Sequence, residues 1–174
     1  MRYSVRTHMS RKQNNYAFID GQNTHKGVQS LGWKIDWFRF RIYLREKYHV
    51  EVAYVFIGFM VQHNALYEHL QKAGFILKFK PVLPDRNGKP KGNVDADLVL
   101  QAMLDYSSYD QAVLVSSDGD FYSLVEHWYS TDKLKMVLSP YIKTCSTLLK
   151  KTAKEKIIYL DTVRPKISQK KSTA

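Results

Sequence analysis

The residues best placed to do chemistry are carboxylates that follow short apolar runs. Asp20 ends the run "YAFI" and is followed by a turn-forming glycine, whereas Asp118 and Asp120 come just after the run "AVLVS". Runs of this length and composition predict buried strands. In a parallel α/β sheet, ligands bind outside the carboxyl ends of the strands, where the loops gather. We therefore expect these three side chains to meet at one edge of a sheet.

A fourth carboxylate, Asp95, stands at the start of a predicted helix, "VDADLVLQAMLDY", that begins near Val94. At about 100° per residue, Asp97, Gln101 and Asp105 fall in one narrow polar wedge, which is the solvated face. Asp95 projects on the apolar side instead, where a carboxylate is costly unless it is paired, protonated or bound to a metal. In an alternative interpretation, the first turn lies beyond the sheet edge and Asp95 only interacts favourably with the helix dipole.

Four converging aspartates cannot all stay ionised without a counter-charge. A divalent cation supplies that charge, and oxygen ligands without a Cys or His cluster suit Mg²⁺ or Mn²⁺ better than zinc. Such a metal activates water and stabilises charge on an attacked phosphate, so the pattern predicts phosphodiester hydrolysis. The alternative is that Asp120 is a helix N-cap and Asp118 a turn residue.

The chain is strongly basic. Its 174 residues include 27 Lys and Arg against 16 Asp and Glu, which gives a formal charge of +11 and a pI near 9.6. This balance favours a polyanionic partner such as nucleic acid or an anionic membrane. Together with an acidic metal pocket it favours nucleic acid, because the basic surface gathers phosphates while the metal acts on one of them.

Cysteine usage and hydropathy indicate the compartment. Cys145 is the only cysteine, which excludes an intramolecular disulfide and is compatible with a reducing cytoplasm. Residues 1–15 have no apolar h-region, so we expect no secretory signal. The longest apolar run, "VAYVFIGFMV", is too short to span about 30 Å of hydrocarbon. We therefore expect a cytoplasmic protein that does not contact a membrane.

Apolar β-rich runs alternate with stretches of helical period, which is typical of an α/β domain with a mainly parallel sheet. The predicted strands are Tyr16–Ile19, Val52–Ile57, Phe75–Lys80, Ala112–Ser116, Leu134–Leu138 and Ile157–Leu160. Predicted helices begin at the N-cap Asp36, span about Gln62–Ala73, begin near Val94, and follow Asp120 and Thr144. Residues 81–93 read as a surface loop, and we expect one domain over residues 15–162 between flexible basic arms at 1–14 and 163–174.

Three segments resemble one known family. "FIDGQN", "KGNVDADLVLQAM" and "VLVSSDGDF", in this order, are similar to the NYN domains of the PIN-like nuclease superfamily, close to the LabA-like group, and the similarity covers roughly Asn15–Leu160. The resemblance implies a three-layer α/β/α sandwich and a metal-dependent ribonuclease that uses Mg²⁺ or Mn²⁺. It also implies metal-site and catalytic roles for four aspartates, Asp20, Asp95, Asp118 and Asp120.

The resemblance also bears on residues around the acids. It implies that Asn23 orders the first loop or contacts the metal shell. Many relatives carry a further acid where this chain has Gln101, although that position lies on the solvated side of the predicted helix. Some PIN-like domains are catalytically silent scaffolds, so a nucleic-acid-binding module without turnover stays open.

Several basic residues could guide a phosphate backbone toward the acids. His25 and Lys26 follow "IDGQN" closely enough to touch substrate, and the predicted loop contributes Arg86, Lys89 and Lys91. Ordinary solvated side chains would give the same pattern. Trp33 could stack on a base or pack in the core. We expect an endonuclease acting on RNA rather than DNA, with the silent RNA-binding module as the alternative.

Overall fold

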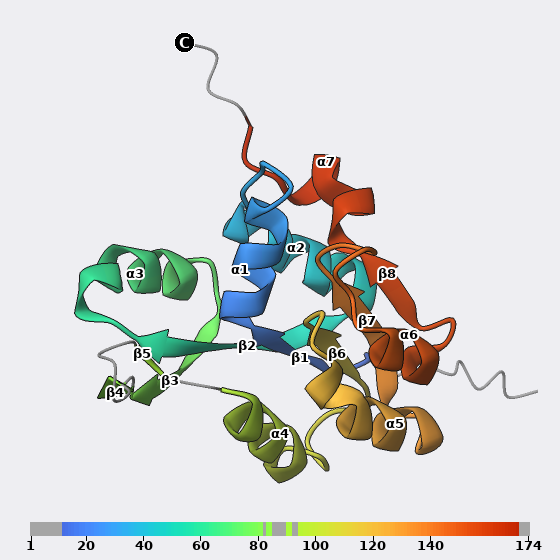
Figure 1. Ribbon diagram of the computed structural model, residues 1–174. Helices are drawn as coiled ribbons and strands as arrows, with labels where there is room; N and C mark the ends of the chain where they lie inside the picture. Colours follow the sequence, from blue (N-terminus) through green and yellow to red (C-terminus); the bar gives the residue numbers. More distant parts are fainter. Residues whose placement is uncertain (1–11, 82, 85–89, 92–93, 171–174) are drawn as a thin grey trace, which may run out of the picture.

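The computed structural model describes residues 12–81, 83–84, 90–91 and 94–170 (Figure 1). Six strands form one sheet in the order β3-β2-β1-β6-β7-β8, and every neighbouring pair is parallel. They are β1 (Asn15–Asp20), β2 (Val50–Phe59), β3 (Ile76–Pro81), β6 (Ala112–Val115), β7 (Leu134–Ser139) and β8 (Ile157–Tyr159). Each predicted strand is therefore present, and the predicted parallel α/β fold is confirmed.

Helices cover both faces of this sheet. They are α1 (Gly21–Gln29), α2 (Trp37–Tyr48), α3 (Asn64–Lys72), α4 (Asp95–Leu104), α5 (Tyr122–Ser130), α6 (Thr147–Ala153) and α7 (Arg164–Ile167). Short 3₁₀ turns complete the connections: η1 (Val61–His63), η2 (Gly119–Phe121) and η3 (Leu160–Val163). One core packs α1, α2, α3 and α7 on one face, and a second core packs α4, α5 and α6 on the other. The expected three-layer α/β/α sandwich is confirmed.

The central strand β1 explains why the sheet needs both layers. Ala17 and Ile19 belong to one core and Phe18 to the other, and all three are fully buried. Successive side chains of a strand point to opposite faces, so a continuous apolar run requires cover on both sides.

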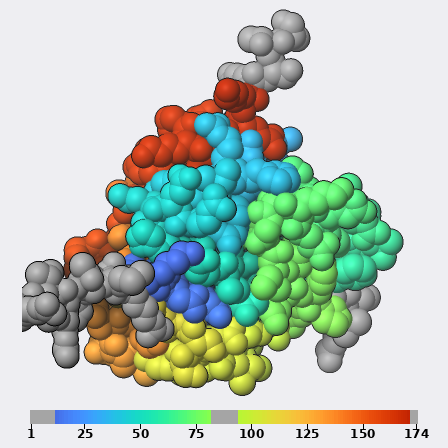
Figure 2. Space-filling model, turned by 180° about the vertical axis from the view of Figure 1, so that it is seen from behind, coloured from blue at the N-terminus to red at the C-terminus, as the bar shows by residue number. Residues whose placement is uncertain are grey.

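Seen from behind, α2 lies as the cyan surface between the red C-terminal segment and the green region of β3 (Figure 2).

Helix α1 occupies a segment that we expected to be a loop. Its sequence "GQNTHKGVQ" contains two glycines and one strongly apolar residue, so helical periodicity is hard to detect. The helix forms because Asp20 caps its N-terminus and because Gly21, Thr24 and Val28 are buried beneath it. Tertiary packing thus overrides a weak local preference.

Two further segments differ from the expectation. Within the expected loop 81–93, β4 (Leu83–Pro84) and β5 (Pro90–Lys91) pair as a short antiparallel hairpin. Part of the expected C-terminal arm is folded, since α7 buries Ile167 completely and the Asp36 amide donates to its carbonyl at 2.8 Å. A single apolar residue among basic ones carries too little periodicity to predict this contact. The expected N-terminal arm lies mostly outside the described residues.

Candidate metal centre

Asp20 ends the central strand with its side chain buried. Only 5% of the residue is exposed. One carboxylate oxygen, Oδ1, accepts a hydrogen bond from the Asn23 amide at 3.1 Å, as expected of an N-cap residue. The strand therefore delivers a carboxylate to the carboxyl edge of the sheet, and the helix that follows holds it in place.

Ser116 connects Asp20 to the neighbouring strand. Its hydroxyl donates to Asp20 Oδ2 at 3.4 Å and accepts from the Asp118 amide at 3.1 Å. Asp118 Oδ1 in turn accepts from the Asp120 amide at 3.0 Å, so Asp118 caps the turn η2. The two strand ends are thereby joined through buried or half-buried polar groups. Sequence reasoning did not assign this role to Ser116, although a serine ending an otherwise apolar strand beside an acid was a usable signal.

Three carboxylates meet beside this link. One oxygen from each of Asp95, Asp118 and Asp120 lies within 4.8 Å of the other two. Asp95 and Asp118 are half-buried and Asp120 is exposed. In contrast, Asp97 forms an ion pair with Lys80 at 3.0 Å. The helical phase that placed Asp95 rather than Asp97 with the other acids agrees with this geometry.

Asp20 lies outside that group of three but within its electrostatic reach. The pKa of the Asp20 carboxyl is raised to about 6, mainly because burial disfavours the charged form. The charges of Asp95 and Asp118 act in the same direction, and hydrogen bonds from Asn23 and Ser116 oppose them. Closely placed carboxylates disfavour one another's ionised forms. The predicted convergence of the acids is therefore present as three adjacent carboxylates with Asp20 buried behind them.

The Asn23 side chain joins α1, which follows β1, to the loop that follows β6. Its side-chain carbonyl accepts from both the backbone amide and the hydroxyl of Ser117, each at 2.9 Å. The next residue of α1 also contacts this strand, because the Thr24 hydroxyl donates to the Val115 carbonyl at 3.3 Å. These contacts attach the first turn of α1 to the end of β6. The expected first loop is thus a helical turn, and Asn23 ties it to the loop that carries Asp118.

The sequence matches the NYN domain over residues 16–161. The chain belongs to the NYN domain family. The matched region runs from β1 to the start of η3 and includes the four aspartates. No curated protein matches the sequence. Among the residues that the structure describes, no helix combines the length and apolarity needed to cross a bilayer.

Two solved structures resemble this NYN domain. A protein of unknown function from Vibrio parahaemolyticus aligns with a TM-score of 0.77 at 22% identity, over 92% of this chain and 98% of that chain. This likeness shows the fold alone. The flap endonuclease of bacteriophage T5, solved in a complex with DNA and metal ions, aligns with a TM-score of 0.47 at 17% identity, over 76% of this chain and 57% of that chain. A similarity that low carries no argument about function.

The acidic residues of this NYN domain have the chemistry of a divalent cation site. All the candidate ligand atoms are carboxylate oxygens, which Mg²⁺, Mn²⁺ and Ca²⁺ prefer. The spacing of these oxygens crowds negative charge at this edge, and a cation would relieve that repulsion. The acidic triad could therefore bind a metal, and Asp20 lies buried beside it.

The predicted substrate residues of the NYN domain fall into two groups. His25 and Lys26 are exposed on α1 and line a cavity on the α1 and α3 face of the sheet. Arg86 and Lys89 lie outside the described residues, and Lys91 lies in β5, where only the backbone is described. Their proposed contacts with phosphate stay predictions.

Trp33, which could have stacked on a base, and Arg41, a basic residue of α2, both have structural positions. Trp33 is 5% exposed and belongs to the core, so it is not placed to stack on a base. Arg41 donates to the carbonyls of Gly74, Val50 and Glu51 at 3.1, 3.1 and 2.7 Å. The Arg41 guanidinium therefore joins α2 to the sheet. Sequence alone does not separate such an arginine from a solvated one.

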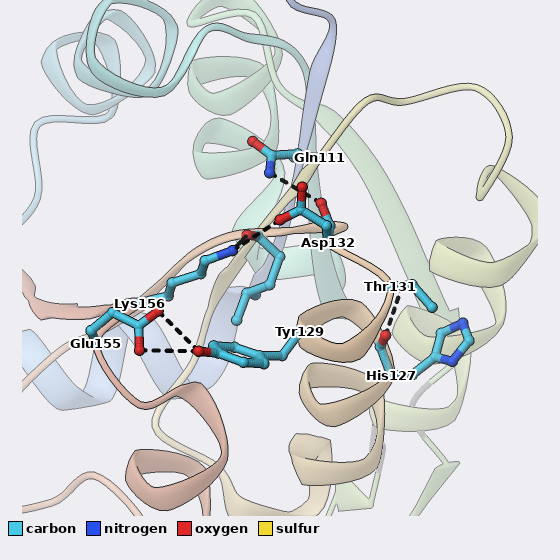
Figure 3. A network of polar contacts seen from close by, with 8 residues as sticks. Gln111, His127, Tyr129, Thr131, Asp132, Glu155 and Lys156 are labelled. Atoms are coloured by element: carbon cyan, nitrogen blue, oxygen red, sulfur yellow. Dashed lines mark hydrogen bonds and ion pairs between the residues drawn. The ribbon is translucent and has the colours of Figure 1, made fainter.

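The basic residues just before β8, Lys154 and Lys156, lie at the opposite edge of the sheet from the acids. Lys156 donates to the Leu134 carbonyl at 3.0 Å and contacts Asp132 at 3.4 Å, beside the Tyr129 hydroxyl that donates to Glu155 (Figure 3). These residues precede β7 and β8, so they lie at the amino edge of the parallel sheet. The aspartates lie at the carboxyl edge.

Proposed function

We propose that this NYN domain is a metal-dependent ribonuclease that cleaves RNA internally. The observation that carries the proposal is the triad of Asp95, Asp118 and Asp120, whose carboxylate oxygens lie within 4.8 Å of one another. The triad sits at the carboxyl edge of a parallel sheet, which is the usual ligand-binding edge. The formal charge of +11 favours a polyanionic substrate around an acidic site.

Each residue has a distinct part in this proposal. The triad would hold Mg²⁺ or Mn²⁺, and Asp20 would complete the ligand set from the end of β1. When bound, such a metal lowers the pKa of a coordinated water and stabilises charge on the attacked phosphate. Ser116 and Asn23 would hold the segments that follow β1 and β6 together, so that Asp20 and Asp118 stay at a constant separation. Lys26 and His25 would contact the RNA beside the site.

The deciding experiment pairs Asp95→Asn with Asp97→Asn on one helix. We expect Asp95→Asn to reduce Mg²⁺- or Mn²⁺-dependent cleavage of a fluorescent single-stranded RNA by at least about 100-fold while the fold is kept, because a metal ligand is lost. Asp97→Asn breaks only an ion pair with Lys80 at the surface, worth about 0–1 kcal/mol, so activity should stay near that of the unaltered protein.

Other outcomes would change the proposal. Cleavage that persists in EDTA and in Asp20→Asn would contradict a metal mechanism and direct attention to acid–base catalysis by histidine. DNA of the same sequence should be cut more slowly than RNA. RNA binding without cleavage under any divalent metal would favour the alternative, a catalytically silent RNA-binding module. Gln101 does not by itself favour that alternative, because it donates to Asp105 at 2.8 Å and lies outside the triad.

A further inference from the structure

A cavity of about 410 Å³ opens on the face of the sheet covered by α1 and α3, at the carboxyl end of β2. Both helices lie on this face in Figure 1, whereas α4 lies on the other. The volume falls within the range of about 300–1,000 Å³ that small-molecule sites span. No residue of the triad lines this cavity, although its lining includes His25 and Lys26, the two proposed RNA contacts.

The walls and the rim of the cavity differ in chemistry. The walls are mostly apolar, with Trp37, Met60, Leu66 and Leu70 among them. The rim carries nitrogen-bearing side chains that are exposed to solvent, namely His25, Lys26 and His63. An apolar slot with cationic and hydrogen-bonding groups at its mouth suits a flat, partly polar ring attached to a phosphate.

The cavity is joined rigidly to the acidic site. Gly21 and Gln22, which line it, directly follow Asp20 in the chain. A Cβ atom at Gly21 would lie 3.0 Å from the Phe56 carbonyl oxygen and 3.0 Å from a Val55 methyl carbon, so the first turn of α1 packs tightly on β2. The cavity wall therefore keeps a constant position relative to the buried carboxylate.

We propose that this cavity accepts one unpaired base of the RNA, next to the phosphate at the acidic site, and so selects single-stranded substrate. The inference rests on the proposed function and names its substrate class. A base within a duplex is stacked and paired, so it could enter the cavity only after it is extruded, which costs the duplex its stacking and pairing at that position. Lys26 at the rim is placed for the phosphate that follows the base. Charge complementarity between this rim and a polyanion favours nucleic acid as the occupant.

The test measures binding without metal, so that it does not depend on cleavage. In EDTA, a short single-stranded RNA that carries one abasic residue at successive positions should lose affinity at one position, by about fivefold or more. The variant Leu66→Trp places a larger side chain from α3 in the cavity. Its affinity for the intact RNA should fall to about the affinity of the unaltered protein for that abasic RNA. It should also be insensitive to the abasic residue. Leu148→Trp, the same change at an exposed position on α6, should behave like the unaltered protein.

Photo-crosslinking provides a second measurement that needs no variant. Thiouridine at the sensitive position should attach to cavity residues such as Trp37 or Met60. A uniform abasic scan, sensitivity that survives in Leu66→Trp, or crosslinks away from the cavity would overturn the inference while leaving the nuclease proposal intact. Loss of metal-dependent cleavage in Asp95→Asn tests that proposal separately.

Discussion

Asp20 is the residue at which folding and the proposed chemistry conflict most. Its carboxyl is buried, and the charges of Asp95 and Asp118 lie close enough to raise its pKa in the same direction as burial does. A protein selected for stability alone would place an apolar residue or an amide at such a position. The cost is consistent with a residue kept for binding a cation.

This conflict predicts how stability depends on pH. The folded-state pKa of Asp20 is about 6, above the ordinary value of 3.8, so its stabilising contribution is full below pH 3.8 and is lost as the pH rises through 6. In EDTA, moving from pH 5 to pH 7.5 should therefore cost the unaltered protein about 1 kcal/mol more than it costs Asp20→Asn. Asparagine still caps α1, so the variant isolates the titration.

Thermal melts of the two proteins at both pH values measure this difference, expected to be about 2–4 °C in Tm. Both proteins contain the same six histidines, so the comparison isolates the contribution of Asp20. Equal pH dependence in the two proteins would show that Asp20 has an ordinary pKa. Added Mn²⁺ should raise the Tm of the unaltered protein more than that of Asp20→Asn.

At the scale of elements, the site depends on the attachment of α1 to β6. Asp20 and Asp118 come from adjacent parallel strands, and the loops that follow these strands are joined through Asn23 and Ser117. The same loops bring η2 against the start of α4, which carries Asp95. The acidic residues therefore meet only if the end of β1, the loop after β6 and the start of α4 keep their relative positions.

Asn23→Ala tests this attachment. Removing the acceptor of two hydrogen bonds should lower the free energy of unfolding by about 1–3 kcal/mol, because the half-buried Ser117 amide loses its partner. The apparent Mn²⁺ affinity should fall more than the rate at saturating metal, since Asn23 positions Asp118 and does not touch the substrate phosphate. Gln29→Ala, an exposed change at the end of α1, is the matched control for both measurements. A change confined to the rate at saturating metal would assign Asn23 to the chemistry instead.

At the scale of the whole molecule, the two edges of the sheet carry charged residues of opposite sign. The carboxyl edge gathers acids, while lysines at the amino edge bind carbonyls and stack on tyrosines, as Lys133 does over Tyr106 and Tyr109. Those lysines contribute to the formal charge but are already engaged within the fold. In the proposed function, the attraction of RNA must therefore come from other basic residues.

Truncation of the chain ends tests one source of that attraction. Residues 1–11 and 171–174 contain four basic side chains, and cutting at these points spares both β1 and α7. If these side chains contact phosphates, their removal should weaken RNA binding and reduce the slope of log K against log salt by about 0.7 per lost contact. Binding titrations from low to moderate salt measure the slope. An unchanged slope would show that the chain ends take no part.

The sequence alone determined the features that depend on local periodicity. Apolar, β-rich runs of strand length predicted all six main strands. The strand ends identified Asp20 and Asp118 because parallel strands share one carboxyl edge. The 100° helical period separated Asp95 from Asp97, as the triad and the Lys80 ion pair show.

Only the tertiary structure decided the features that depend on contacts between distant segments. Helix α1 forms on weak local propensity because it packs on β2 and β6, and α7 forms because Ile167 fills the core beside α2. The burial of Trp33, the carbonyl contacts of Arg41 and the cavity between α1 and α3 follow in the same way. Each requires residues far apart in the chain to meet, and single-sequence patterns carry no information about which distant partner a side chain will find.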